Sequence, residues 1–180
     1  MDPRLQEMLD HHEITRTLTE YCHGCDRCDE AHMGSVYTED SWDDHGHIKA
    51  SGAEFARVMT ASVLESTDTL AHLLGQSMIN VNGDKAGAET YFLAVSCDTR
   101  EDGSRACNQL GGRYVDKLQR VDGRWLIKER IVVRDWTISL PLEQEWLSAT
   151  SIQPGHRSNA DPSYATLGLV HGDVDHKRSA

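Results

Sequence analysis

Residues 72–97 read HLLGQSMINVNGDKAGAETYFLAVSC, and this stretch decides the fold. Apolar residues are frequent on both sides of Asn82-Gly83, a dipeptide typical of the tight turn in a β-hairpin. The pattern therefore predicts a strand over 72–81 and an antiparallel partner over 86–97.

A second hairpin follows the first one. Residues 107–121 and 125–138 are rich in alternating or β-branched apolar residues, and Asp122-Gly123 between them is again a hairpin turn signal. A polar loop over 98–104 is expected to join the two hairpins.

The chain before residue 72 has helical spacing instead. Apolar residues recur at intervals of three and four over 5–26, with Asp2 as the expected N-cap and Pro3 as the first helical residue. Two further helices are expected over 29–37 and 52–64.

The segment between these two helices is harder to interpret. Residues 38–40 are polar and turn-like, and 42–50 is a possible strand that His45-Gly46-His47 weakens. Helices followed by consecutive strands indicate an α+β fold, with the helices packed on one face of a curved antiparallel sheet.

The last part of the chain is polar and contains Pro154, Gly155 and Pro162. We expect one domain over 1–140 and a C-terminal extension over 141–180. That extension is expected to cover a surface, with a short helix around 142–147 and a disordered end over 171–180.

Length and charge exclude several classes of protein. A chain of 180 residues corresponds to one domain, and a net charge of -11 argues against nucleic acid and anionic membrane surfaces as partners. The sequence has no apolar run near the ~20 residues needed to span a bilayer and no signal-peptide pattern at its start. We therefore expect a cytoplasmic protein whose five cysteines are reduced thiols.

Three cysteines lie close together as Cys22, Cys25 and Cys28. A C-x2-C-x2-C spacing can hold zinc or an iron–sulfur cluster, but no fourth ligand follows in the usual pattern. Residues three apart on a helix share a face, so these thiols are also ordinary small core residues. We expect no metal site here.

Histidines are numerous, and His72 differs from the others because it opens an apolar strand. A buried carboxylate such as Asp26, at the end of the first helix, would fix the tautomer of such a histidine and make its other nitrogen a base. A satisfied core histidine is the plainer alternative. His45 and His47 alternate and could be ligands, although pairs of this kind are more often on the surface.

Arg130 and Asp135 are charged residues within an otherwise apolar strand. Simple alternation places Arg130 beside Lys128 on one face, which could be solvated or could line a cavity. Nucleophile elbows, phosphate-binding glycine loops and dinucleotide fingerprints are absent, so we expect no nucleotide cofactor.

Several motifs in register resemble the nuclear-transport-factor-2-like superfamily in its SnoaL-like branch. They are Tyr21-Cys22-His23-Gly24-Cys25-Asp26-Arg27, Tyr37-Thr38-Glu39-Asp40-Ser41-Trp42, Ala71-His72-Leu73-Leu74-Gly75-Gln76, Gly112-Arg113-Tyr114-Val115-Asp116 and Asp122-Gly123-Arg124-Trp125. The family fold is a cone, a bent antiparallel sheet wrapped on long helices around an apolar pocket.

Within that superfamily the chain is similar to cofactor-free lyases of the scytalone dehydratase, hexachlorocyclohexane dehydrochlorinase and bile-acid dehydratase types. The resemblance implies that Asp26 and His72 form a catalytic dyad in the pocket. It also implies that Arg130 faces the pocket to support Asp26 or the substrate, and that Tyr21 assists the leaving group.

The expected reaction needs no cofactor and no metal. His72 would remove a proton, and water, halide or formaldehyde would leave an apolar, aromatic substrate. Pocket residues are expected from the aromatic and thioether side chains Trp42, Phe55, Met59 and Phe92. An isomerase or polyketide cyclase on the same dyad, and a non-catalytic subunit like the small subunit of ring-hydroxylating dioxygenases, are alternatives. Relatives of this branch are commonly trimers, so the resemblance implies a homotrimer.

Overall fold

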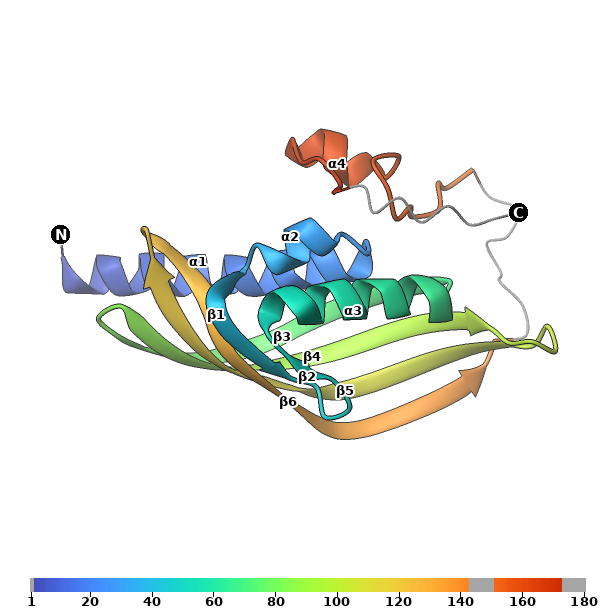
Figure 1. Ribbon diagram of the computed structural model, residues 1–180, viewed down its shortest axis with the longest axis horizontal. Coiled ribbons are helices and arrows are strands. Elements are labelled where there is room, and N and C mark those ends of the chain that lie inside the picture. Colours follow the sequence, from blue (N-terminus) through green and yellow to red (C-terminus); the bar gives the residue numbers. More distant parts are fainter. Residues whose placement is uncertain (1, 143–150, 173–180) are drawn as a thin grey trace.

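A computed structural model describes residues 2–142 and 151–172. Its helices lie against one face of a single, open, curved sheet (Figure 1). The elements are α1 (Pro3–Asp26), α2 (Glu30–Gly34), β1 (Tyr37–Asp44), β2 (Lys49–Ala50), α3 (Gly52–Ser66), β3 (Thr69–Asn82), β4 (Lys85–Thr99), β5 (Arg105–Val121), β6 (Arg124–Pro141) and α4 (Pro162–Leu167). The predicted α+β class is therefore confirmed.

Helix α1 begins as its sequence predicts. The Asp2 carboxylate accepts the backbone N–H of Arg4, and Pro3 occupies the first helical position. The second half of α1 packs into the core through residues at helical spacing, such as Ile14, Leu18 and Tyr21, all at most 1% exposed.

The corner between α1 and α2 fixes where α1 ends. Cys28 adopts a left-handed φ of 53°, and the Asp29 carboxylate then accepts the backbone N–H of His32 to start α2. The expected helix over 29–37 is too long, because α2 ends at Gly34 and the buried Tyr37 already belongs to β1.

Gly24 lets α1 and α2 approach closely, and we expect Gly24→Ala to destabilise the protein. A Cβ at position 24 would stand 2.6 Å from the backbone nitrogen of Met33 and 2.7 Å from its Cα, so the α2 backbone would have to move. Overpacking of this kind costs about 1–3 kcal/mol. Urea denaturation measures the loss, and Gly87→Ala, where a Cβ meets nothing within 4 Å, is the matched control.

The turn expected over 38–40 is wrong, because these residues lie within β1. Parallel pairing with β6 joins Tyr37 before them and Trp42 after them, and the pairing is irregular between these two residues. Glu39 and Asp40 face solvent within this irregular stretch. The possible strand over 42–50 is in fact the end of β1, a turn and the short β2.

The strand order is β2-β1-β6-β5-β4-β3. Both predicted hairpins are present, with Gly83 and Gly123 at φ of 62° and 80° in their turns. The expected all-antiparallel sheet is wrong at one place, because β1 and β6 pair in parallel. Strand β1 follows α2 directly and lies beside β6, the last strand in the chain. Pairing of β4 with β5 continues to Thr99 and Arg105, so the loop between them is shorter than expected.

Two bulges in β6 decide which of its side chains face inward. Trp125 and Ile127 are buried, and after a register shift at Lys128 the buried position is Arg130. A second shift falls at Asp135. Simple alternation therefore fails along this strand, as β-bulges require.

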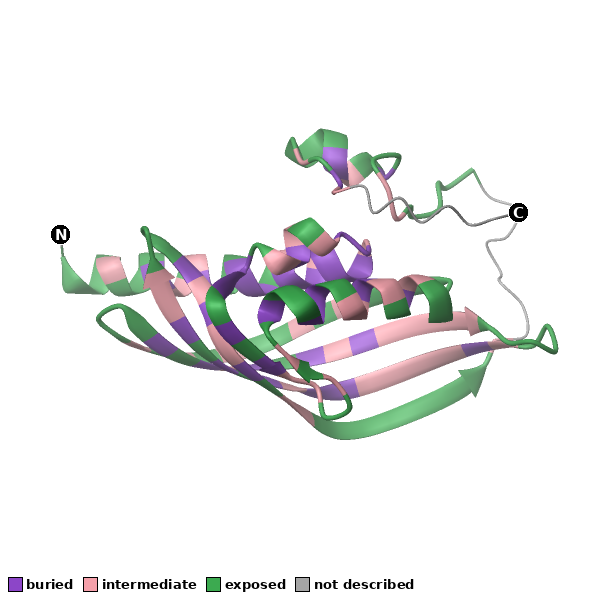
Figure 2. Ribbon diagram, in the orientation of Figure 1, coloured by how far each residue is buried: buried purple, intermediate pink, exposed green. Residues whose placement is uncertain are grey.

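Helices α1 and α3 cover the inner face of the sheet, and the core lies between these layers. Figure 2 shows that the distal half of β6 is exposed, and residues 134–141 are exposed at every position. The outer face of the sheet is the one turned away from these helices. Exposed apolar side chains of this outer face, each 37–55% accessible, include Leu73, Tyr91, Val115, Ile131, Trp136 and Leu140.

Residues 151–172 pack against the helices. The Tyr164 hydroxyl donates to Asp29 at 2.9 Å, and the Arg157 guanidinium donates to the carbonyl of Thr67 at 2.7 Å. The helix expected around 142–147 and most of the disordered end expected over 171–180 lie outside the described residues; His171, which is described, is buried and hydrogen-bonded. No helix in the described part of the chain is long and apolar enough to cross a membrane.

Candidate active site

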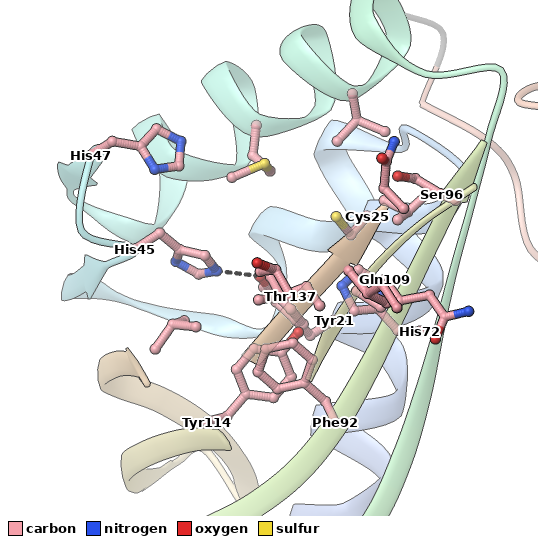
Figure 3. A pocket seen from close by; sticks show the side chains of 18 of the residues that line it. Tyr21, Cys25, His45, His47, His72, Phe92, Ser96, Gln109, Tyr114 and Thr137 are labelled. Carbon is pink, nitrogen blue, oxygen red and sulfur yellow. Dashed lines mark hydrogen bonds between the residues drawn. The ribbon is translucent and has the colours of Figure 1, made fainter. Parts of the chain in front are cut away.

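A cavity of about 460 Å³ lies between the helices and the inner face of the sheet (Figure 3). This volume is within the range of small-molecule sites. Its walls are mostly apolar, with a few convergent polar groups. The lining residues are Tyr21, Cys25, His45, His47, Met59, Val63, Leu70, His72, Phe92, Ala94, Ser96, Asn108, Gln109, Leu110, Tyr114, Val132, Thr137, Ile138 and Ser139.

Asp26 and His72 meet at one wall of this cavity. Nδ1 of His72 lies 2.6 Å from Oδ1 of Asp26, and Oδ2 of the same carboxylate accepts the backbone N–H of His72 at 2.9 Å. An ionised carboxylate only accepts, so Nδ1 carries the proton. Nε2 of His72 is then a free lone pair on a cavity-lining ring, which is the arrangement of a general base.

The site depends on where α1 ends and β3 begins. Asp26 is the last residue of α1, and His72 is the fourth residue of β3, on its inward face. Both carboxylate oxygens of Asp26 accept hydrogen bonds from His72, so the carboxylate fixes the His72 ring relative to its backbone. The sequence pattern alone left a satisfied core histidine as the plainer reading, but His72 lines a cavity.

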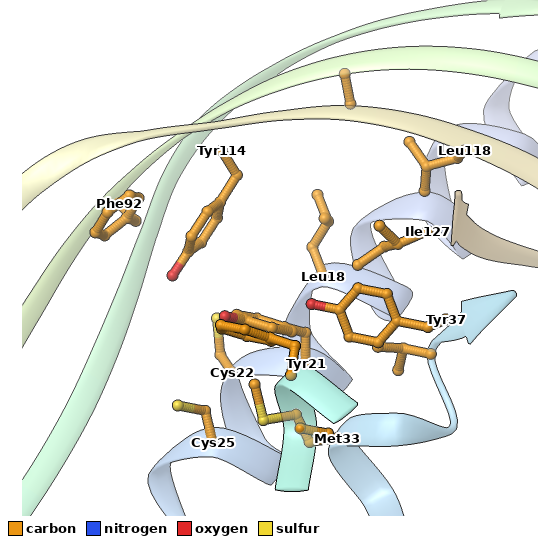
Figure 4. Packing of buried hydrophobic residues seen from close by; sticks show 14 of the residues in the cluster. Leu18, Tyr21, Cys22, Cys25, Met33, Tyr37, Phe92, Tyr114, Leu118 and Ile127 are labelled. Carbon is orange, nitrogen blue, oxygen red and sulfur yellow. The ribbon is translucent and has the colours of Figure 1, made fainter. Parts of the chain in front are cut away.

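Aromatic rings form another wall. Phe92 of β4 and Tyr114 of β5 stack at 4.2 Å between ring centroids, and Tyr21 of α1 meets Tyr114 edge to face at 5.5 Å (Figure 4). Burial raises the pKa of Tyr21 well above its ordinary 10.0, so this residue keeps its proton at neutral pH.

A second aspartate–histidine pair, Asp43 and His45, faces the same cavity from the end of β1. Nδ1 of His45 bonds to Oδ1 of Asp43, whose Oδ2 accepts the Tyr37 hydroxyl at 2.5 Å. Nε2 of His45 lies 3.2 Å from the Tyr21 hydroxyl. Sequence reasoning noticed His45 only as a possible ligand or surface residue, although the Asp-x-His spacing on one strand face was the available signal.

Arg130 does not take the place expected from the family resemblance. It is fully buried and does not line the cavity. Its guanidinium forms a bidentate pair with Asp116 at 2.7 and 2.8 Å, and not with Asp26. It also lies between the Tyr21 and Tyr114 rings, 4.1 Å from each centroid. The bulge at Lys128 turns it inward, so the solvated alternative is also wrong.

Two of the four expected pocket residues line the cavity and two do not. Met59 and Phe92 are cavity residues. Trp42 is 49% exposed and faces away from the cavity, because it occupies an outward-facing position of β1. Phe55 is fully buried and stacks on the His45 ring at 4.2 Å, so it supports the wall from behind.

The three clustered cysteines are buried free thiols. Burial raises the pKa of Cys22 to about 12 and that of Cys25 well above its ordinary 9.0, which disfavours the thiolate that a metal needs. Over the described residues, no group of three or more histidine, cysteine or carboxylate side chains is placed to hold a metal ion. Cys25 lines the cavity as a small apolar residue.

We expect the protein to lose stability below neutral pH because of His45. Burial lowers its pKa from the ordinary 6.5, reinforced by Arg130 and His72, while Asp43 only partly compensates. Below pH 6.5 the unfolded chain therefore takes up a proton that the folded protein refuses, and the free energy of unfolding falls. Urea denaturation at neutral and mildly acidic pH measures this loss. It is expected to be smaller in His45→Gln, and an unchanged loss would contradict the assignment to His45.

Solved structures with the same fold include proteins of different kinds. A putative scytalone dehydratase from Novosphingobium aromaticivorans aligns with a TM-score of 0.66 and 21% identity, over 73% of this chain and 88% of that one. A hexachlorocyclohexane dehydrochlorinase of type 2 aligns with a TM-score of 0.66 and 18% identity, over 84% and 97%. A protein of unknown function from Mycobacterium tuberculosis aligns at 0.64 and 21%, over 75% and 77%. These likenesses show the fold.

A comparison with curated protein sequences found no match. The family model of the SnoaL-like domain matches residues 6–131, which is more than half of the chain and includes α1 and nearly all of the sheet up to the middle of β6. The match contains both aspartate–histidine pairs and the aromatic wall. The chain therefore belongs to the SnoaL-like domain family.

Proposed function

We propose that this protein is a cofactor-independent lyase that removes a proton from a small apolar substrate with His72 and releases water, halide or formaldehyde. The observation that carries the proposal is the Asp26–His72 pair on the wall of an apolar cavity. The dehydratase and dehydrochlorinase among proteins of this fold support the same reaction class.

The mechanism follows from the hydrogen bonds of His72. When water or halide is released, Nε2 takes a proton from carbon, and the C–H electrons form a double bond as the leaving group departs with the electron pair of its own bond. When formaldehyde is released, Nε2 takes the proton of a hydroxyl group, the O–H electrons form the C=O bond of formaldehyde, and the electrons of the broken C–C bond stay on the substrate carbon, which takes a proton in turn. Asp26 holds Nδ1–H and stabilises the imidazolium that forms. A positioned general base of this kind typically contributes about 10²–10⁴-fold to the rate.

The cavity walls favour an aromatic or alicyclic substrate. Phe92 and Tyr114 offer stacked ring faces, and Met59 adapts its shape to the ligand. Arg130 contributes at a distance, because it holds Tyr21 and Tyr114 against each other without touching the substrate.

The outer face of the sheet supports self-association, and we propose a homo-oligomer, with a trimer favoured by the family resemblance. Leu73, Tyr91 and Ile131 are each 44–55% exposed on this face, which leaves an extended apolar surface open. Sedimentation velocity measures the subunit number, and a monomer at micromolar concentration would contradict the proposal.

Mass spectrometry tests the reaction. Metal-stripped protein is incubated with hydroxylated and halogenated aromatic and alicyclic compounds, beside a His72→Gln control. Loss of water, hydrogen halide or formaldehyde that depends on His72 supports the lyase. Hydrogen exchange into a compound in heavy water without loss of mass supports an isomerase or cyclase instead. Absence of both, together with a co-purifying large subunit, supports a non-catalytic role.

A further inference from the structure

The cavity contains a second chain of proton donors and acceptors that the reaction above does not use. Asp43 is fully buried and accepts both the Tyr37 hydroxyl and Nδ1–H of His45. His45 bonds through Nε2 to the Tyr21 hydroxyl, which lines the cavity. Figure 3 shows the His45 ring directed into the cavity from the side opposite β3.

We propose that Asp43, His45 and Tyr21 form a proton relay that binds a hydroxyl group of the substrate and exchanges protons with it. The proposal deepens the proposed lyase function and rests on it. It assigns the substrate class as apolar molecules that react at an oxygen substituent, and it separates two tasks: His72 handles the proton on carbon, and the relay handles the proton on oxygen.

The direction of each hydrogen bond follows from the donor inventory. The Asp43 carboxylate accepts, so Nδ1 of His45 carries a proton, and Nε2 of the neutral ring accepts from Tyr21. Because the Tyr21 proton points to His45, the Tyr21 oxygen presents its lone pairs to the cavity. A ligand hydroxyl is the complementary donor, whereas a carbonyl or a halide is not.

The resting state of the relay is fixed by its neighbours. Burial, the Arg130 guanidinium and His72 all lower the pKa of His45, against the favourable Asp43 carboxylate, so the neutral ring predominates near pH 7. The imidazolium of such a ring is a stronger acid than a solvated one, which suits it to protonate an alcohol. Tyr21 passes the proton on without becoming a tyrosinate, which its burial disfavours.

In a dehydration the protons balance as follows. The C–H bond breaks, its proton goes to Nε2 of His72 and its electrons form C=C. The form that reacts is the minor one in which Nε2 of His45 has taken a proton from solvent and donates to the Tyr21 oxygen, so the Tyr21 proton is turned toward the substrate. The C–O bond breaks with its electron pair on oxygen, which takes the Tyr21 proton while Tyr21 takes the proton from Nε2 of His45. Water leaves, His72 has gained one proton and His45 has lost one, and exchange with solvent resets both rings.

A halide substrate would not need this relay. Chloride is the anion of a strong acid and departs unprotonated, but hydroxide is a poor leaving group and needs a proton in the transition state. A buried relay of three residues is therefore explained by an oxygen leaving group. This selects water over halide among the products considered above.

Binding of 4-nitrophenol tests the relay without any turnover, because its hydroxyl can donate to the Tyr21 oxygen only while His45 is neutral. At a pH where free 4-nitrophenol and His45 are both mostly neutral, 4-nitroanisole, which lacks the donor, is expected to bind about fivefold more weakly, the ratio of one net hydrogen bond. On further acidification a protonated His45 donates to Tyr21 and turns the Tyr21 proton toward the cavity, so we expect the preference for 4-nitrophenol to disappear.

Three variants separate the possible sources of the signal. His45→Gln can still accept from Tyr21 but takes up no proton, so it keeps the preference for 4-nitrophenol when the pH is lowered. Tyr21→Phe loses the preference at every pH. His12→Gln on the exposed surface of α1 keeps both the preference and its pH dependence.

Each outcome decides the proposal. A wild-type protein that shows no preference for 4-nitrophenol, a wild-type preference that is unchanged on acidification, or a His45→Gln variant that still loses the preference on acidification would each overturn it. A pH-dependent preference that requires His45, without any His72-dependent elimination, would sustain the relay and reject the lyase. Elimination that depends on His72 without such a preference would sustain the lyase and reject the relay.

Discussion

Replacing His72 with glutamine is expected to lower kcat by about 10²–10⁴-fold, the usual contribution of a general base. Glutamine is close in size to histidine and can still contact Asp26, but it takes up no proton at neutral pH. Because His72 acts in the transition state, kcat and kcat/KM should fall together while KM changes little. Steady-state kinetics on whichever substrate the mass-spectrometric screen identifies provides the measurement.

Asp26→Asn is the matched variant for this prediction. Its carbonyl oxygen can still accept the backbone N–H of His72, but the amide –NH₂ then faces Nδ1 and forces the proton onto Nε2, the atom that must act as base. We expect a rate loss of similar size with the cavity intact. A variant that folds normally and retains wild-type kcat would remove Asp26 from the mechanism.

The largest expected effect on stability comes from Asp116→Ala. This substitution leaves the Arg130 guanidinium, which is fully buried, without its bidentate partner. Breaking a buried pair in this way costs about 3–5 kcal/mol, because one charge stays in a medium that solvates it poorly. Urea or thermal denaturation measures the loss.

The double variant Asp116→Leu with Arg130→Met separates the charge from the packing. It removes both ions and keeps apolar volume, so we expect it to recover most of the stability that Asp116→Ala loses. If Asp116→Ala proves as stable as wild type, Arg130 is not held as described. If the double variant remains as unstable as the single one, packing between Tyr21 and Tyr114 is the main contribution of Arg130.

Local signals predicted the hairpins and the long helices correctly, since each depends on residues close in sequence. Asn82-Gly83 and Asp122-Gly123 specify turns by themselves, and Asp2 with Pro3 specifies a helix start. The failures have a different physical origin. Residues 38–40 lie within a strand because β6, which is distant in the sequence, pairs in parallel with Tyr37 before them and with Trp42 after them.

The same contrast between local signals and long-range contacts applies to the site. The Asp26–His72 contact was anticipated from the family resemblance, whereas Arg130 was misplaced because a bulge at Lys128 resets the inward face of β6 and Asp116 supplies the partner. Asp43 and His45 were not recognised as a pair, because only the fold shows that β1 brings them to the cavity opposite β3.

Hydrogen exchange at substrate carbon tests the central claim most directly. Metal-stripped wild-type protein, His72→Gln and Asp26→Asn are each incubated with substrate in heavy water, and deuterium in the recovered compounds is measured by mass spectrometry and NMR. Proton removal by His72 predicts exchange or product formation by the wild type alone, unaffected by metal removal. Equal exchange in His72→Gln, or exchange that disappears when metal is stripped, would contradict it.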